Sequence, residues 1–171
     1  MTHSALKPTT LIIAAVLTLS AGNAWACEPS DLPLYAAFEG EWLSDGNAFG
    51  QPAASRMNWS MTMDSCFWQV DYEIDTNPGT DAANTFMGRG VHIAENGDIT
   101  GSWIDNQAVI HRLRGTISDT ELLVYWGEPE ARLGRSRYTA MEDGSIQVTD
   151  WILAFEGWQQ FNDNRFERVG D

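Results

Sequence analysis

The sequence from residue 57 to residue 75 alternates between apolar and polar side chains, and this pattern constrains the fold more than any other feature. The apolar positions are Met57, Trp59, Met61 and Met63, followed by Cys66, Trp68, Val70, Tyr72 and Ile74. Successive side chains of a β-strand point to opposite faces of a sheet, so each segment is predicted to be a strand with one buried face. Asp64 and Ser65 form the tight link between the two strands.

Similar patterns continue to the end of the chain. Further strands are predicted at residues 39–44, 86–94, 98–105, 108–117, 120–126, 131–141, 145–155 and 158–169. Asn96 and Gly97 give a strong hairpin signal, because both residues tolerate a positive φ angle. A looser connection is expected at residues 77–84, and one short helix at residues 30–38 with Ser30 as its N-cap.

The short turns pair each strand with the next one in an antiparallel meander. About ten such strands must split into two sheets or close into a barrel. An immunoglobulin-like sandwich needs long crossing connections, and residues 77–84 offer the only candidate. The prediction is therefore an all-β fold: a closed antiparallel up-and-down β-barrel of about ten strands, with a short N-terminal helix and room for one small ligand.

Residues 1–26 have the features of a secretory signal peptide. A basic start is followed by an apolar run at residues 11–19 and by an A-x-A cleavage site that ends at Ala26. The apolar run is shorter than the roughly 20 residues that span a bilayer. We expect residues 27–171 to form a single periplasmic or secreted domain with no membrane span.

The two cysteines, Cys27 and Cys66, both follow the predicted cleavage site. In an oxidising compartment this pair is predicted to form a disulfide. A lipid on Cys27 is the alternative, although Ala24 stands where a Leu-like residue usually precedes a lipidated Cys. Nothing supplies further soft ligands at a metal-binding spacing, so no metal site is predicted.

After the predicted cleavage site the chain has nine Arg, no Lys and 24 acidic residues, a net charge of −15. This charge repels nucleic acid and anionic membranes. Because the acidic residues are scattered along the chain, solubility is one explanation of the negative charge. Attraction of a cation or a basic partner is the alternative explanation. The basic cluster is Arg132, Arg135 and Arg137; alternation puts Arg132 on one strand face and the other two on the opposite face. A monomer and a homodimer both fit the sequence.

Several short motifs follow one another along the predicted barrel. They are a G-x-W at residues 40–42, a W-x-D at residues 103–105, a G-T at residues 115–116, a W-G at residues 126–127 and an R-F-E-R at residues 165–168. This set resembles the lipocalin-like, or calycin, barrels, and in particular a family of uncharacterised bacterial calycin-like proteins. The resemblance covers most of residues 38–169. It implies that Trp42 closes one end of the barrel and that Arg168, with Arg165 as the alternative, packs over its indole, a favourable stack for a planar guanidinium.

Nitrobindin, a haem-binding barrel of a neighbouring group, has a similar opening G-x-W. Its haem iron is held by a His close to the C-terminus. Here no His follows His111, and the closing strand carries Arg165 and Arg168 instead. We therefore predict neither haem nor another cofactor.

Large aromatic side chains occupy many positions that alternation turns inward. The candidates for the wall of a ligand cavity are Trp59, Trp68, Trp103, His111 and Trp126. Trp rings line an apolar cavity for a flat or hydrophobic ligand, or they fill a narrow barrel solid. The sequence leaves these two alternatives open.

Asp105 and Asp150 each lie beside a Trp-bearing strand segment. If either faces the interior, burial raises its pKa and suits it to act as a general acid. A carboxylate at a strand end that accepts hydrogen bonds from a turn is the alternative.

Three hypotheses for the function follow. The first is binding of a small, largely apolar or amphipathic molecule inside the barrel. The second is an enzyme that acts on such a ligand with His111 and Asp105 as acid and base, which requires both in one cavity within hydrogen-bond reach. The third is a non-catalytic domain with a filled barrel whose acidic surface holds a basic partner. No familiar catalytic motif such as G-x-S-x-G or C-x-x-C is present, so catalysis is not the favoured hypothesis.

Overall fold

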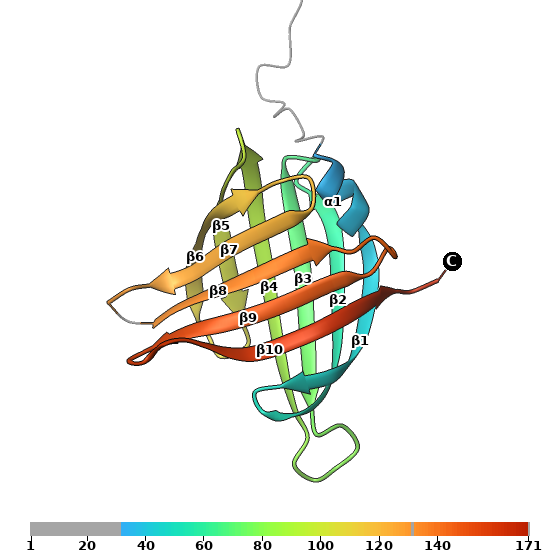
Figure 1. The fold of residues 1–171 in the computed structure, drawn as a ribbon, viewed down its shortest axis with the longest axis vertical. Helices are drawn as coiled ribbons and strands as arrows, with labels where there is room; N and C mark the ends of the chain where they lie inside the picture. Colours follow the sequence, from blue (N-terminus) through green and yellow to red (C-terminus); the bar gives the residue numbers. More distant parts are fainter. Residues whose placement is uncertain (1–31, 131, 171) are drawn as a thin grey trace, which may run out of the picture.

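A computed structural model describes residues 32–130 and 132–170, and these form ten strands that close into a barrel (Figure 1). The elements are α1 (Pro33–Phe38), β1 (Gly40–Ala48), β2 (Gln51–Thr62), β3 (Phe67–Thr76), β4 (Asn84–Glu95), β5 (Asp98–Asp105), β6 (Ile110–Ile117), β7 (Glu121–Glu128), β8 (Arg132–Ala140), β9 (Ile146–Ala154) and β10 (Gly157–Arg168). Each strand pairs with its neighbours in sequence, and β1 pairs with β10 to complete the ring. The predicted antiparallel up-and-down barrel is confirmed.

The first hairpin is longer than alternation predicted. β1 continues to Ala48 and β2 begins at Gln51. Ser44 and Ser55 pair across the two strands and are both buried, so polar residues occupy positions where alternation looks for apolar ones. Met63 was predicted to end the next strand, but it lies in the turn to β3 with a φ of 52°. The hairpin turn predicted at residues 96–97 is present, with positive φ at both residues.

Helix α1 covers one end of the barrel (Figure 1). It begins at Pro33 with Leu32 as its N-cap, and the predicted N-cap, Ser30, lies outside the described residues. Proline suits the first helical position because its fixed φ is already helical and the missing N–H has no partner there. The buried face of α1 packs on the barrel: the Tyr35 ring stacks on Trp68 at 4.6 Å between centroids.

The G-x-W motif fixes how α1 joins the barrel. The Trp42 indole donates a hydrogen bond to the carbonyl of Phe38 at 2.7 Å. Arg168 lies over that indole, with Cζ 4.3 Å from the ring centroid, and donates to carbonyls at the end of α1, including that of Ala37 at 2.7 Å. Gly40 has a φ of 115°, and a Cβ there would lie 2.7 Å from Arg168 Nη1. The motif therefore needs Gly both for its backbone angle and for the approach of the arginine.

The pairing of β1 with β10 is interrupted in its middle. Trp42 and Leu43 pair with the end of β10, and pairing resumes at Ala48. In the gap the Asn164 side chain takes the place of a backbone ladder. Its Oδ1 accepts from the N–H of Asn47 at 3.2 Å, and its Nδ2 donates to the carbonyl of the same residue at 3.1 Å.

The predicted signal peptide at residues 1–26 and Cys27 lie outside the described residues. Cleavage, lipid attachment and a disulfide between Cys27 and Cys66 therefore stay predictions. Within residues 32–130 and 132–170, no helix is long and apolar enough to cross a membrane.

Candidate functional site: an aromatic cavity with a buried carboxylate

The interior of the barrel contains a cavity of about 140 Å³, so the side chains do not fill the barrel solid. Apolar and aromatic side chains make up most of its wall. They are Phe49, Trp59, Val70, Tyr72, Ile74, Phe86, Trp103, Val109, Leu113, Leu122, Val124, Trp126, Tyr138 and Phe161. A cavity of about 150 Å³ accepts a molecule the size of benzene in another protein, which sets the scale of a ligand here.

Two glycines leave room for two of the indoles that form the cavity wall. Gly88 on β4 lies under the ring of Trp103, and Gly134 on β8 lies under the ring of Trp126. A Cβ at either glycine would overlap the ring that covers it. Glycine at these strand positions is explained by the close approach of a large side chain. The cavity walls are therefore set by the backbone as well as by side-chain packing.

The end of the cavity opposite α1 is bordered by three phenylalanine rings. Phe49 stacks on Phe161 at 5.2 Å between centroids and lies 6.3 Å from Phe86. Phe161 reaches the cavity because β10 bulges between Gln160 and Asn162. The bulge lets Phe161 and the next residue both face inward, which a regular strand cannot do.

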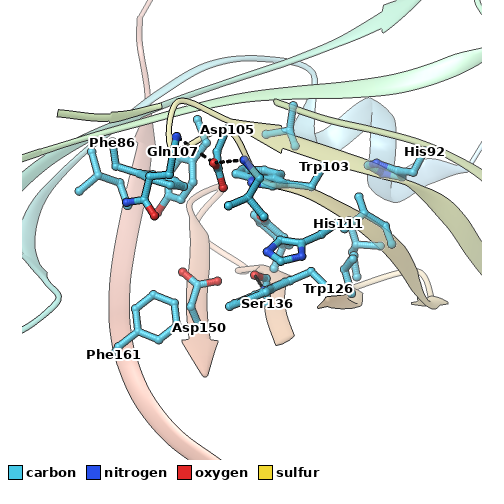
Figure 2. Close-up of a pocket in the computed structure, with 18 of the residues that line it drawn as sticks. Phe86, His92, Trp103, Asp105, Gln107, His111, Trp126, Ser136, Asp150 and Phe161 are labelled. Carbon is cyan, nitrogen blue, oxygen red and sulfur yellow. Dashed lines mark hydrogen bonds between the residues drawn. The ribbon is translucent and has the colours of Figure 1, made fainter. Parts of the chain in front are cut away.

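Asp150 on β9 places a carboxylate in the wall of this cavity (Figure 2). The residue is 5 % exposed. Burial raises the pKa of Asp150 from 3.8 to about 6, and hydrogen bonds from Ser136 and Asn162 oppose the shift. Ser136 also accepts a hydrogen bond from the Trp126 indole at 3.2 Å, so the carboxylate, the hydroxyl and a wall indole form one chain.

A row of asparagines supports the carboxylate. Asn162 Nδ2 donates to Asp150 Oδ2 at 2.5 Å and lies 3.2 Å from the Tyr72 hydroxyl. Asn164 in turn donates to Asn162 Oδ1 at 2.6 Å. Burial, and next the charge of Asp150, raise the pKa of the Tyr72 and Tyr138 hydroxyls, so both remain neutral at physiological pH. The polar groups around Asp150 are therefore uncharged.

A second polar group lies toward α1. His92 is 1 % exposed, and neither of its ring nitrogens has a hydrogen-bond partner within residues 32–130 and 132–170. Burial lowers the pKa of His92 to about 4, so the ring is neutral at physiological pH. The ring of Trp59 lies 5.7 Å from that of His92, and its indole N–H also has no hydrogen-bond partner in the part of the chain that the structure describes. Figure 2 shows that His92 lies apart from Asp150.

Four of the five predicted cavity residues line the cavity: Trp59, Trp103, His111 and Trp126. Trp68 does not, because Tyr35 of α1 stacks on its ring at the covered end. Alternation placed the Trp68 side chain inward correctly, but it does not show where the helix covers the barrel.

Asp105 and His111, the predicted acid and base, both line the cavity, but each makes its contacts with other residues. Asp105 Oδ1 accepts hydrogen bonds from the backbone N–H groups of Gln107 at 3.0 Å and Val109 at 3.2 Å. His111 packs 5.5 Å from the Trp126 ring. The Asp105 carboxylate holds a turn, as the alternative proposed, and Asp150 is the buried carboxylate.

The basic cluster divides between the two faces of β8. Arg132 lines the cavity and is exposed. Arg135 lies outside, between the rings of Trp151 and Trp158, with Cζ 4.6 Å from each centroid.

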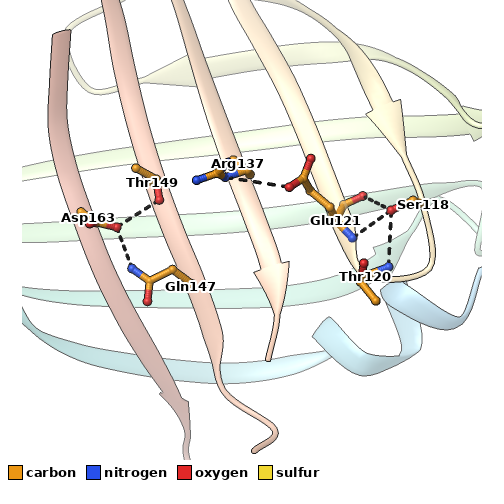
Figure 3. Close-up of polar contacts among 7 residues, drawn as sticks. All are labelled: Ser118, Thr120, Glu121, Arg137, Gln147, Thr149 and Asp163. Carbon is orange, nitrogen blue, oxygen red and sulfur yellow. Dashed lines mark hydrogen bonds and ion pairs between the residues drawn. The ribbon is translucent and has the colours of Figure 1, made fainter. Parts of the chain in front are cut away.

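The outer face of the barrel also carries the Asp163 carboxylate, which accepts hydrogen bonds from the side chains of Gln147 and Thr149 on β9 (Figure 3).

Compared with models of protein families and with curated proteins, the sequence matches none. In the described part of the chain, no group of three or more His, Cys, Asp or Glu side chains is placed to hold a metal ion. The class defined by fold and site is a closed antiparallel β-barrel with an aromatic cavity.

Proposed function

We propose that this protein is an exported, calycin-like barrel that binds a small, largely apolar ligand in its interior. The observation that carries the proposal is the cavity of about 140 Å³ with its mainly aromatic and aliphatic wall. Small-molecule sites are typically concave and apolar, with a few polar groups that fix orientation. Asp150, Ser136, His92 and His111 are such groups in this cavity.

The two other hypotheses have less support. An enzyme with Asp105 and His111 as its acid–base pair needs a free carboxylate, whereas Asp105 accepts two backbone hydrogen bonds in a turn. A domain that works only through its acidic surface needs no cavity, whereas the interior here is hollow. Binding is therefore the function that the geometry favours.

The proposal is tested with toluene as a neutral probe of suitable size. Toluene should raise the melting temperature of the protein, because a ligand that binds the folded state stabilises it by mass action. The Val124→Phe variant puts a ring into the cavity and should lose this effect. Leu123→Phe adds a ring on the outer face of the same strand, next to Val124, and should keep it. If toluene and benzylamine both leave the melting temperature unchanged, and native mass spectrometry finds no bound molecule, the proposal is overturned.

Export is tested by the intact mass of the protein purified from a host with a secretion pathway. A mass that begins at Cys27 and lacks two hydrogens supports cleavage and a disulfide with Cys66. An added acyl mass on Cys27 shows a lipoprotein instead, and an uncleaved N-terminus contradicts export.

A further inference from the structure

Asp150 differs from the acidic residues that form ion pairs, because it is buried and no cationic side chain of the described residues pairs with it. The ion pairs among the described residues are Glu41 with Arg56, Asp71 with Arg89, Glu121 with Arg137 and Asp143 with Arg165. All four pairs lie on the surface. A buried charged group is usually hydrogen-bonded and paired with an opposite charge; Asp150 accepts hydrogen bonds but has no ion pair among the described residues.

The protein orients this carboxylate but does not neutralise it. Asn162 and Ser136 provide hydrogen bonds, and both side chains are neutral. A carboxylate has about four acceptor positions, so these bonds leave acceptor capacity unused. Figure 2 shows the Asp150 carboxylate directed into the cavity between Phe161 and Ser136.

The surroundings of this free acceptor suit an organic cation. The rings of Trp103, Trp126 and Phe161 border the same cavity, and the faces of aromatic rings attract cations. The size of the cavity limits the apolar part of the ligand to about one six-membered ring. The strongly acidic surface also favours the approach of cations over anions.

We propose that the ligand is a small primary amine with an apolar body, and that its ammonium group pairs with Asp150. This inference rests on the proposed function, because it assigns a chemical class to the ligand of the same cavity. Asp150 supplies the charge, Asn162 and Ser136 hold it in place, and the aromatic wall takes the apolar body.

Other titratable or charged groups face the same cavity from several strands. They are Tyr72 on β3, His92 on β4, Asp105 on β5, His111 on β6, and Arg132 and Tyr138 on β8. The Arg132 side chain is exposed, so solvent and salt screen its charge. Neither histidine is close enough to Asp150 to form an ion pair with it among the described residues.

The test compares four probes that share a phenyl ring: benzylamine, benzyl alcohol, toluene and benzoate. At pH 7.5 we expect the wild-type protein to bind benzylamine at least tenfold more tightly than benzyl alcohol, measured by calorimetry. Asp150→Asn should remove this preference and still bind toluene. The matched control is Asp163→Asn, which makes the same charge change on the outer face and should keep the preference.

The pH profile supplies a second readout. Benzylamine affinity should fall as pH drops below about 6, where Asp150 becomes protonated, and Asp150→Asn should not show this fall. Binding of toluene with no preference for benzylamine, or tighter binding of benzoate, overturns the amine assignment and leaves the proposed function intact. Failure of every probe in a protein that also carries no bound molecule overturns both.

Discussion

At the scale of single residues, two of the buried titratable groups of the cavity, Asp150 and His92, act on stability in opposite directions. The pKa of Asp150 rises from 3.8 to about 6 in the folded protein. The folded state therefore holds this proton more tightly than the unfolded state, and Asp150 stabilises the fold below pH 4 relative to pH 7. That contribution, about 3 kcal/mol by the size of the shift, is lost as pH rises through about 6.

His92 has the opposite sign. Its pKa falls from 6.5 to about 4 because the buried ring resists protonation. The unfolded state binds the proton more tightly, so the His92 contribution is present above pH 6.5 and is lost as pH falls through about 4. Its size is also about 3 kcal/mol. The two groups therefore offset one another between pH 4 and pH 6.5.

Replacing Asp150 should reveal this balance. We expect Asp150→Asn to be more stable than the wild type at pH 7.5 by up to about 3 kcal/mol, because the variant buries no charge. The advantage should shrink to zero near pH 4, where the wild-type carboxyl is itself neutral. Urea unfolding of both proteins across this range measures the difference. A difference in stability that does not change with pH would show that the pKa of the Asp150 carboxyl is not raised in the folded protein.

The Arg168 stack gives a second prediction at the residue scale. Arg168→Lys keeps the charge but loses the planar group that covers Trp42 and reaches two carbonyls at once. We expect a loss of about 1–2 kcal/mol in the free energy of unfolding. Arg165→Lys is the matched control on the same strand. Its exposed pair with Asp143 should contribute less than about 1 kcal/mol. Equal effects of the two changes would argue against a role for the stack in closing the barrel.

At the scale of elements, the glycines under the indoles set the shape of the cavity. Gly134→Ala on β8 should push Trp126 into the cavity, because a Cβ would overlap its ring. We expect a loss of about 1–3 kcal/mol in stability from overpacking. Toluene and benzylamine binding should fall together, since the space itself is reduced. Gly170→Ala, where no atom of the described residues lies within 4 Å of the added Cβ, is the control for the thermal-shift and binding measurements.

The turn between β1 and β2 is a second element with a testable role. Phe49 has a φ of 55°, which costs about 1–3 kcal/mol for most residues and little for Asn. Phe49→Asn removes this cost and also the ring that stacks on Phe161, whose loss is worth about 0.5–1.5 kcal/mol. The gain and the loss oppose one another, so the variant should lie between about 0.5 kcal/mol less stable and about 2.5 kcal/mol more stable than the wild type. The dissociation rate of benzylamine, measured by stopped-flow fluorescence, should rise severalfold. This rise is expected because the Phe49 ring borders the end of the cavity opposite α1. A large loss of stability with an unchanged dissociation rate would contradict a role of Phe49 in retaining the ligand.

The same elements show what the sequence predicts well. Strands with one apolar face, such as β3, follow the alternation of side chains between the two faces of a sheet. The hairpin between β4 and β5 follows from Asn96-Gly97, because both residues tolerate a positive φ angle. β1 and β2 were predicted too short because Ser44 and Ser55 face inward. The inward Phe161 depends on a bulge in β10, and a single sequence carries no period-two signal for an extra residue.

At the scale of the whole molecule, the barrel was predictable and the arrangement of its interior was predictable in part. Inward Trp residues follow from alternation, but the position of α1, which removes Trp68 from the cavity, is set by tertiary packing. Asp105 and Asp150 look alike in the sequence. They are distinguished by their partners: two backbone N–H groups of a turn for Asp105, and Asn162, twelve positions along the chain, for Asp150.

The interrupted pairing of β1 with β10 has a consequence for the kinetics of folding. Asn164 and Asn47, which bridge the gap, are 117 positions apart, whereas the other strand pairs join neighbours in sequence. Bringing such distant segments together costs the most chain entropy, so β1–β10 should pair late, after the hairpins. The cavity is complete only after that step. A ligand should therefore slow unfolding and leave the refolding rate unchanged, as denaturant-jump measurements with and without benzylamine can determine. The lifetime of the closed ring would then depend on what it holds.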